Sequence, residues 1–358
     1  MKIAMIAFSV KGAMGQYLET LVSELRNYLD ICLVAPKSFG QSIPNVRTIN
    51  FETAENKILT LKTYLNLRWA KDVWHEIISG KPDLIYIFNG EGYPWSPLFA
   101  RWASKEGIPL LMTIHDPKLH PGASLWERMN GLTRRLVVPH ARSVHVHSKL
   151  FIDTAKQLGA KDVEVIPHLS IADRFLKHRK NDVERNEKLA LFFGRIEAYK
   201  GLDVFVRAML YLNGRKKGII AGPGRIPGRI VRIVKQYPQI FEVENRFIPD
   251  EEVAVLFQRA SVLVLPYKQA TQSSLPCIGA AFGLPVVATA IGGFLEDVPK
   301  VGGILVEPND HKALAKAILE ARVRCRPSVP EEFLPSNVGL QFYKWFIRVV
   351  EGKKKDMI

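Results

Sequence analysis

The chain has 358 residues, more than one hydrophobic core usually serves, so its length predicts two domains. With 47% hydrophobic and 24% charged residues, both domains can be well packed, which excludes a largely disordered protein. The formal net charge of +15 favours an anionic partner. Because the sequence has no zinc-finger spacing and no aromatic RNA-binding strand, nucleic acid ranks below a phosphorylated substrate or an acidic membrane surface.

Strands and helices alternate in the first half of the chain. Residues 2–8 are a predicted buried strand, followed by a loop with Gly12 and Gly15 and an amphipathic helix over about 16–29. Further strands are predicted at residues 31–35, 84–88, 110–114 and 143–146. This alternation indicates a parallel, doubly wound sheet. The loop SVKGAMGQ has neither the full dinucleotide spacing nor a Walker lysine, so phosphate binding and a plain tight turn both fit it.

Residues 57–78 show a helical pattern that mixes basic side chains with leucine and tryptophan. These are Lys57, Lys62, Arg68 and Lys71, together with Leu61, Leu65, Trp69 and Trp74. Such a helix is typical of a membrane interface and also of a solvated helix packed on a sheet, and both interpretations remain open.

The composition becomes polar and charged over residues 175–188, where we place the linker between the domains. We divide the chain into a first domain over residues 1–170 and a second over 171–337. The second repeats the alternation, with strands predicted at residues 189–193, 217–221, 242–245 and 262–265. An amphipathic helix at 338–352 is predicted to complete the first domain, with Trp345 and Phe346 as packing residues.

Residues 262–298 form a predicted strand, polar turn, short helix and second strand. Ser273 and Ser274 are candidates to cap the helix, Pro276 suits its first turn, and Gly283 suits the position just after its end. A helix start at the carboxyl end of a buried strand offers unpaired N–H groups to an anion. An ordinary crossover without a ligand is the alternative.

Two cations follow the strand predicted at residues 189–193. Gly194 comes directly after it, Arg195 is next, and Lys200 starts the following helix. In an open α/β sheet this edge faces the ligand crevice, where Arg195 can grip a phosphate and Lys200 can add a point charge. Alone, such residues are more often part of a solvated surface. Together with the helix start after Ser273 they indicate a diphosphate site.

The segments FFGRIEAYKGLD, AGPG, NRFIPDEEVAVLFQRASVLVLPY, ATQSS, AFGLPVVAT and GGFLEDV resemble the retaining nucleotide-sugar glycosyltransferases of family 4, over residues 189–319. The first domain matches more loosely, through its glycine loop, residues 114–122 and the hinge at Pro167 and His168. The resemblance implies the GT-B fold, an α/β architecture of two Rossmann-like domains facing a central cleft. The second domain would bind the donor and the first the acceptor.

The resemblance also implies roles for individual residues. Arg195 and Lys200 would stabilise the departing diphosphate as charge develops on it, and His115 would contact the transferred sugar. Asp116 or His120 would hold the acceptor, and the two are not ranked. The donor-binding residues so implied are Gly12, Gly15, Gly194, Thr271, Gln272, Ser273, Ser274 and Glu296.

The chain departs from the family at one pair of positions. Most members carry two glutamates spaced E-x7-E, where this chain has Ala270 and Ile278. The ATQSS run is similar to a sub-branch with ATQSG that lacks the pair, although Ser274 stands where that branch has glycine. Ribose recognition is therefore unassigned, with Glu296 or Asp297 as substitutes, and uridine and guanosine donors both remain open.

The combined expectation is a metal-independent, retaining hexosyltransferase without a cofactor, acting in polysaccharide biosynthesis. It would move a hexose from a nucleotide-diphosphate sugar to a glycan or lipid-linked acceptor at the cytoplasmic membrane face. Three scattered cysteines, an N-terminal apolar run too short for a signal peptide, and no stretch of roughly 18 apolar residues favour a cytoplasmic or peripheral location. The alternatives are a catalytically impaired nucleotide-sugar-binding partner of a glycan-assembly complex and a sugar-nucleotide epimerase.

Overall fold

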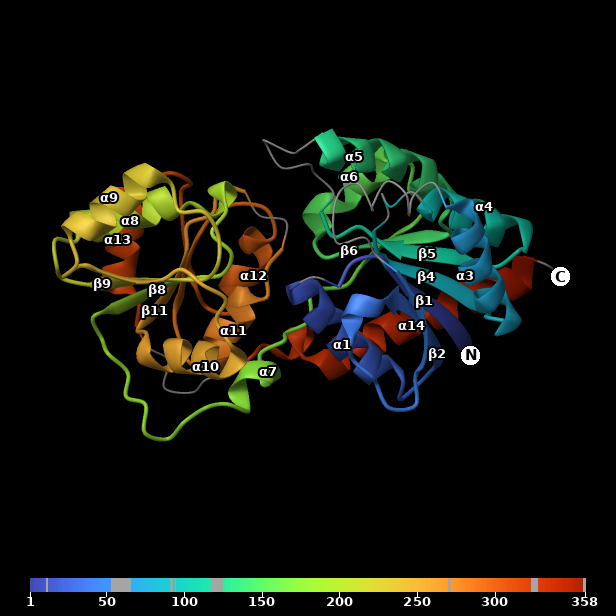
Figure 1. The fold of residues 1–358 in the computed structure, drawn as a ribbon, viewed down its shortest axis with the longest axis horizontal. Coiled ribbons are helices and arrows are strands. Elements are labelled where there is room, and N and C mark those ends of the chain that lie inside the picture. The colour runs from blue at the N-terminus through green and yellow to red at the C-terminus, as the bar shows by residue number, and fades with distance from the viewer. Residues whose placement is uncertain are drawn as a thin grey trace. The chain divides into compact units, whose positions relative to one another are not determined.

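The structure is a computed structural model, and it describes residues 1–10, 12–52, 66–90, 93, 95–116, 125–269, 272–322 and 328–356. The chain forms two compact units. Unit 1 comprises Met1–Leu169 and Pro335–Ile358, and unit 2 comprises Ser170–Leu334. Each unit is a parallel sheet with helices on both faces (Figure 1), which confirms the predicted α/β architecture.

The described part of unit 1 contains seven parallel strands in the order β3-β2-β1-β4-β5-β6-β7. Their bounds are β1 Lys2–Ala7, β2 Asp30–Pro36, β3 Arg47–Phe51, β4 Leu84–Asn89, β5 Leu110–Thr113, β6 Ser143–Val146 and β7 Val163–Val165. The strands β1, β2, β4, β5 and β6 lie where the sequence predicts strands. The edge strands β3 and β7 were not predicted, because β3 is partly exposed and β7 is short with no fully buried residue.

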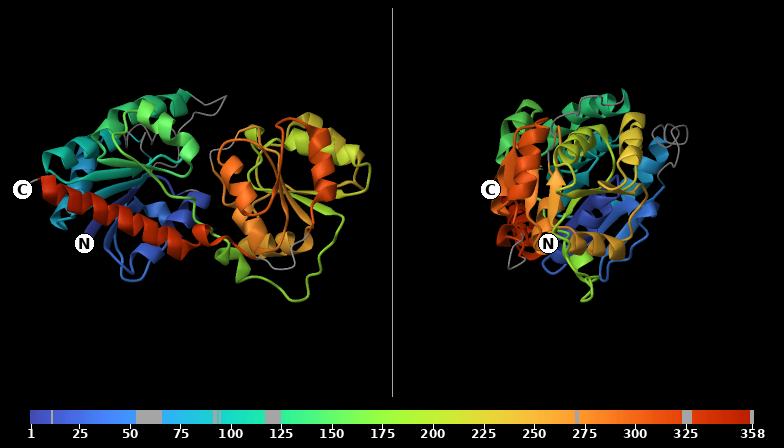
Figure 2. Two further views of the ribbon diagram at one scale, coloured as in Figure 1. Left: turned by 180° about the vertical axis from the view of Figure 1, so that it is seen from behind. Right: turned by 90° about the vertical axis from the view of Figure 1, so that its left-hand side faces the viewer.

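Helices cover both faces of the unit 1 sheet. Their bounds are α1 Ala13–Leu25, α3 Leu67–Ser79, α4 Ser96–Lys105, α5 Leu125–Val137, α6 Ile152–Gln157 and α14 Pro335–Asp356. Helix α14 lies along the sheet (Figure 2), with Trp345 and Phe346 buried as predicted. The indole Nε1 of Trp345 donates to Oγ of Ser143 at 3.0 Å. In α3, Trp74 is buried whereas Trp69 is 42% exposed, and residues 57–65 lie outside the described residues.

Within its described residues, unit 2 has six parallel strands in the order β10-β9-β8-β11-β12-β13. Their bounds are β8 Leu189–Phe193, β9 Lys217–Ala221, β10 Phe241–Glu244, β11 Val262–Leu265, β12 Val286–Thr289 and β13 Ile304–Val306. The helices are α7 Asp173–Leu176, α8 Leu202–Tyr211, α9 Gly228–Gln236, α10 Asp250–Arg259, α11 Leu275–Ala281, α12 Phe294–Lys300 and α13 His311–Glu320. The central strands β8 and β11 are fully apolar, which is why sequence reasoning found their bounds.

The polar segment at residues 175–188 is not a linker, because it lies inside unit 2. The backbone N–H of Lys180 donates to Oε1 of Gln258 at 2.9 Å, and Nε2 of Gln258 donates back to the Lys180 carbonyl at 2.6 Å. Arg185 donates to the Phe282 carbonyl at 2.7 Å. These bonds tie a solvated segment to α10 and to the end of α11, so its polarity reflects exposure and not a domain boundary.

Candidate functional site

Two loops meet at the carboxyl ends of β8 and β11 in unit 2. Gly194 follows β8 with φ of 109°, and a Cβ there would lie 2.7 Å from Nζ of Lys200. Gly201 follows Lys200 with φ of 70°, and a Cβ there would come within 1.9 Å of the Pro266 carbonyl oxygen. Both glycines therefore permit a contact that a side chain would block. The contact places the lysine between the two strand ends.

Lys200 is a buried cation, with 8% of the residue exposed. Its Nζ lies 5.4 Å from the centre of the Tyr267 ring, within the range of a cation–π interaction. Burial lowers the pKa of Lys200 to about 8, an effect opposed by the nearby carboxylate of Glu197 and reinforced by Arg195. The ammonium thus stays mainly charged at neutral pH in a site with little solvent.

Tyr267 links the lysine to the polar turn before α11. It is 3% exposed, and its side chain is hydrogen-bonded to Ser273, although burial outweighs this bond and raises the pKa of the phenol. Its carbonyl accepts from Oγ1 of Thr289 at 2.6 Å, which ties the loop to the end of β12. Sequence reasoning did not single out Tyr267. A signal for it in the sequence was an aromatic residue two positions after the end of a buried strand, on the edge predicted to bind a ligand.

Arg195 differs from Lys200 in being exposed. Its side chain is 71% exposed, and its Nη1 lies 3.1 Å from Oε1 of Glu197. A flexible guanidinium next to a buried ammonium provides a fork for an anion at this edge. Glu197, which sequence reasoning also missed, is near both cations and balances part of their charge.

The turn before α11 brings some of the predicted donor residues to the same edge. Ser274 is the N-cap residue, while Oγ of Ser273 accepts from the backbone N–H of Leu275 at 3.3 Å. Gln272 precedes them, and Thr271 lies outside the described residues. Helix α11 has only seven residues, so its dipole is a weaker anion site than the sequence suggested. Fixed charge at this edge therefore comes from the two basic side chains.

The positions of the missing glutamates and their substitutes differ in environment. Ile278 is 2% exposed in the interior of α11, and Ala270 lies outside the described residues. Glu296 and Asp297 lie in the first turn of α12. Burial raises the pKa of Asp297 to about 7, with Glu296 and Glu332 adding to the shift and Lys300 opposing it. Both side chains are partly exposed, so both stay candidates for a polar ligand.

In unit 1, the predicted glycines serve the loop after β1. Gly12 has φ of 60°, and a Cβ on Gly15 would lie 2.5 Å from the Val10 carbonyl oxygen. Asp116 is exposed, and its carbonyl accepts from Nη1 of Arg134 at 2.8 Å. The other acceptor candidate, His120, lies outside the described residues.

His115 lies at the carboxyl edge of the unit 1 sheet in a group of buried histidines. The group comprises His115, His145, His147 and His168, each at most 8% exposed. The ring centre of His147 is 5.0 Å from that of His115, 4.5 Å from that of His145 and 5.1 Å from that of His168. The ring of Tyr17 from α1 packs on the group, 4.4 Å from that of His168.

Burial keeps three of these histidines neutral. It lowers the pKa of His145 and of His168 to about 3, and the pKa of His147 well below its ordinary value. Neighbouring histidines lower each value further, while hydrogen bonds to backbone carbonyls partly oppose the shift. His115 is therefore packed against polar rings that carry no charge.

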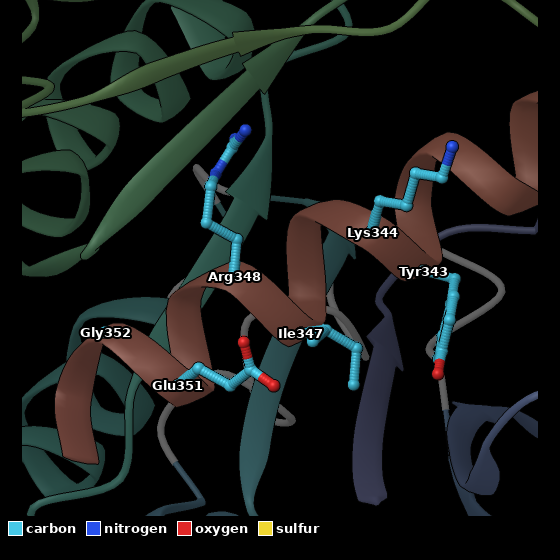
Figure 3. A pocket seen from close by; sticks show the side chains of 6 residues that line it. All are labelled: Tyr343, Lys344, Ile347, Arg348, Glu351 and Gly352. Carbon is cyan, nitrogen blue, oxygen red and sulfur yellow. The ribbon is translucent and has the colours of Figure 1, made fainter. Parts of the chain in front are cut away.

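A separate hollow of about 410 Å³ lies along α14 (Figure 3). It is lined by Tyr343, Lys344, Ile347, Arg348, Glu351 and Gly352. Arg348 is paired with Glu164 of β7, and the ring of Tyr343 stacks on that of Tyr28 at 5.1 Å. Because Trp345 contacts Ser143 at the start of β6, this stretch lies toward the amino ends of the strands, opposite His115. The hollow is therefore not part of the candidate site.

Two parallel sheets, with a buried lysine and an exposed arginine at the carboxyl edge of the second, define an α/β protein of two Rossmann-like units. The model for "Glycosyl transferases group 1" matches residues 187–322, and that for "Glycosyl transferase 4-like domain" matches residues 12–168. Together these matches cover most of the chain. The chain belongs to the glycosyltransferases of the family 4 type, which have the GT-B fold.

Relatives and solved structures agree with this assignment. A putative teichuronic acid biosynthesis glycosyltransferase, TuaC of Bacillus subtilis, is 24% identical over 93% of this chain and 92% of its own length. A match to an uncharacterized glycosyltransferase of Methanocaldococcus jannaschii, 28% identical, covers 41% of this chain and only 39% of that protein.

The fold is shared with structures of low sequence identity. Sucrose-phosphate synthase from Thermosynechococcus elongatus has a TM-score of 0.72 at 19% identity, over 98% of this chain and 100% of its own. Anabaena HepE in complex with UDP has a TM-score of 0.67 at 17% identity, over 100% of this chain and 99% of its own. These likenesses establish the GT-B fold.

Proposed function

We propose that the protein is a retaining glycosyltransferase that moves a hexose from a nucleotide-diphosphate sugar to a glycan or lipid-linked acceptor. The observation that carries this proposal is the buried Lys200 between the ends of β8 and β11, with Arg195 beside it. A buried ammonium and an exposed guanidinium suit a leaving group whose negative charge grows as the sugar–oxygen bond breaks. Unit 2 would hold the donor, and a nucleotide donor is supported by HepE, which shares the fold and was solved in complex with UDP.

The chemistry assigned to unit 2 requires no bound metal. Lys200 and Arg195 neutralise the diphosphate, and Gln272, Ser273 and Ser274 add hydrogen bonds from the turn before α11. Glu296 would contact the ribose in place of the glutamate that Ile278 replaces. Turnover that is unchanged by a chelator supports metal independence, and a strict requirement for magnesium contradicts it.

Unit 1 would hold the acceptor and His115, which contacts the transferred sugar. The proposed location is the cytoplasmic face of a membrane, in contact with a lipid-linked acceptor. Two exposed leucines on α5, Leu132 and Leu136, lie beside Arg134 and Arg135, and the net charge is +15. Basic side chains next to exposed apolar ones suit an anionic membrane surface. No helix among the described residues is long and apolar enough to span a bilayer.

The test is an assay of transfer and of slow donor hydrolysis. UDP- and GDP-linked hexoses are offered with sugar and lipid-linked acceptors, and the anomeric configuration of any product is read by NMR. Transfer with retention supports the proposal. If no donor is consumed under any condition, the enzyme assignment fails.

A second candidate is a nucleotide-sugar-binding partner without turnover, which the buried Ile278 favours because no carboxylate is present at that position. It predicts that UDP or GDP binds while no sugar is transferred. Transfer that falls in both Arg195→Ala and Lys200→Ala excludes this candidate, because the activity of a contaminating enzyme would be unaffected by those changes.

A further inference from the structure

Two histidines follow neighbouring strands of unit 1 and meet at the edge of the sheet. Thr113 at the end of β5 is in register with His145 of β6, so His115 and His147, two positions further on, lie side by side on one face. Nε2 of His147 is 2.9 Å from Nδ1 of His115. Nε2 of His115 is 2.9 Å from the carbonyl oxygen of Phe88. Both ring nitrogens of His115 are thus engaged.

The Phe88 carbonyl indicates which ring nitrogen of His115 carries the hydrogen. A carbonyl oxygen only accepts, so His115 donates through Nε2. A neutral imidazole has a single N–H, which makes Nδ1 of His115 the acceptor and Nε2 of His147 the donor. His147 is itself held neutral, because burial, with His145, His115 and His168 around it, keeps its pKa well below the ordinary value.

We propose that His147 is a positioning residue that holds His115 in the tautomer with its hydrogen on Nε2. The inference rests on the proposed function, in which His115 contacts the transferred sugar. Nε2–H is then the group that a sugar oxygen can share with the Phe88 carbonyl, while the bond from His147 fixes the ring plane. Without His147 the Phe88 carbonyl alone favours this tautomer, so a fraction of the molecules carries the hydrogen on Nδ1 and presents no donor to the sugar.

His145 provides a matched control. It is 0% exposed and belongs to the same histidine group. Its ring bonds go to Oγ1 of Thr113 at 2.9 Å and to the Ile166 carbonyl at 2.8 Å, and not to His115. A substitution at His145 therefore disturbs the same core without removing the bond that fixes the tautomer.

The first experiment compares kcat in His147→Phe, His147→Gln and His145→Phe. Loss of one hydrogen bond to a reacting group predicts that His147→Phe lowers kcat about tenfold with little change in the donor KM. His147→Gln, which keeps an N–H donor, stays within about threefold of wild type by the same reasoning. An unchanged kcat in His147→Phe, or an equal loss in His145→Phe, overturns the proposal.

The second experiment does not depend on activity. Nitrogen-15 NMR of histidine-labelled protein reports which ring nitrogen carries hydrogen, and His115→Gln assigns the His115 signals. The expected spectrum has hydrogen on Nε2 of His115 in wild type and a mixture of tautomers in His147→Phe. Hydrogen on Nδ1 of His115 in wild type overturns the role of His147. A wild-type protein that transfers no sugar but gives the expected spectrum refutes the proposed function alone.

Discussion

The carboxyl edges of the two sheets bury ionisable groups with opposite results for their charge. In unit 2, burial lowers the pKa of Lys200 to about 8 while the nearby Glu197 opposes the shift, so the ammonium stays mainly charged at neutral pH. In unit 1, burial lowers the pKa of His145 to about 3 and the pKa of His147 well below its ordinary value, and neighbouring histidines add to the shift, so both rings are neutral. Burial acts in the same direction at both edges, and the charge differs because an amine starts from a much higher pKa than an imidazole. This difference supports the proposal that the anion binds in unit 2 and the uncharged sugar lies against the histidines of unit 1.

The largest expected effect comes from removing the buried charge of unit 2. Lys200→Met keeps the length of the side chain and should lower kcat for transfer about 100- to 1,000-fold, because developing charge on the leaving group loses a fixed cation. Steady-state kinetics with a saturating donor measure the change. Lys217→Met, at the start of β9 and so at the opposite edge of the sheet, serves as the control. A kcat of Lys200→Met within tenfold of wild type would show that the charge of Lys200 does not stabilise the leaving group.

The next effect concerns the close contact that buries Lys200. Gly201→Ala should lower the free energy of unfolding by about 3 kcal/mol or more, since the new Cβ meets the Pro266 carbonyl and φ is positive. Gly214→Ala also has positive φ, but nothing lies within 4 Å of the added Cβ, so a loss of about 1 kcal/mol is expected. Urea unfolding compares the two variants. Equal losses of unfolding free energy in the two variants would mean that the close approach of Gly201 to the Pro266 carbonyl does not contribute to stability.

A smaller effect is expected for the exposed cation. Arg195→Ala should lower kcat about tenfold, because a solvated guanidinium gives less stabilisation than a buried ammonium. Arg195→Lys should recover part of the loss, since it restores the charge without the fork. Parallel kinetics of the three proteins check this order. A loss larger than that of Lys200→Met would reverse the assignment of the principal cation.

The smallest effect is a pH dependence set by Lys200. Donor affinity should weaken as the pH rises through about 8, where the ammonium loses its proton. Because this pKa is below the unfolded value of about 10.4, the unfolded chain binds more protons between these values, so stability should rise there with pH. Calorimetric titration and thermal unfolding from pH 7 to 10.5 follow both trends. Lys200→Met should show neither trend. If its pH dependence is the same as that of wild type, another group is responsible for the titration.

Sequence reasoning found the sheets where apolar runs are continuous, as in β8, β9 and β11, whose predicted bounds match the structure. It missed β3, β7 and β13, since an edge strand needs no continuous apolar run. The linker prediction failed because polarity alone does not distinguish a tethered surface segment from a boundary, and only the bonds to Gln258 and Phe282 reveal the difference.

For the site, the position of Lys200 at a strand end was predictable, but its burial was not, because it depends on the Tyr267 ring and on the approach of Gly201 to Pro266. His115 was likewise found from its place after a strand. Its partner His147 requires the register between β5 and β6, which no spacing along the chain gives. The roles of all these residues remain predictions.

The most direct test of the division between the two edges is the binding of UDP and GDP, with uridine and guanosine as uncharged controls, to wild type and Lys200→Met. Calorimetry should show that at least one diphosphate binds wild type and that the matching nucleoside binds more weakly. In Lys200→Met, the affinity for that diphosphate should fall about tenfold or more, whereas the affinity for the nucleoside should not change. Equal affinity of wild type and Lys200→Met for the diphosphate would contradict an anion site at the edge of unit 2.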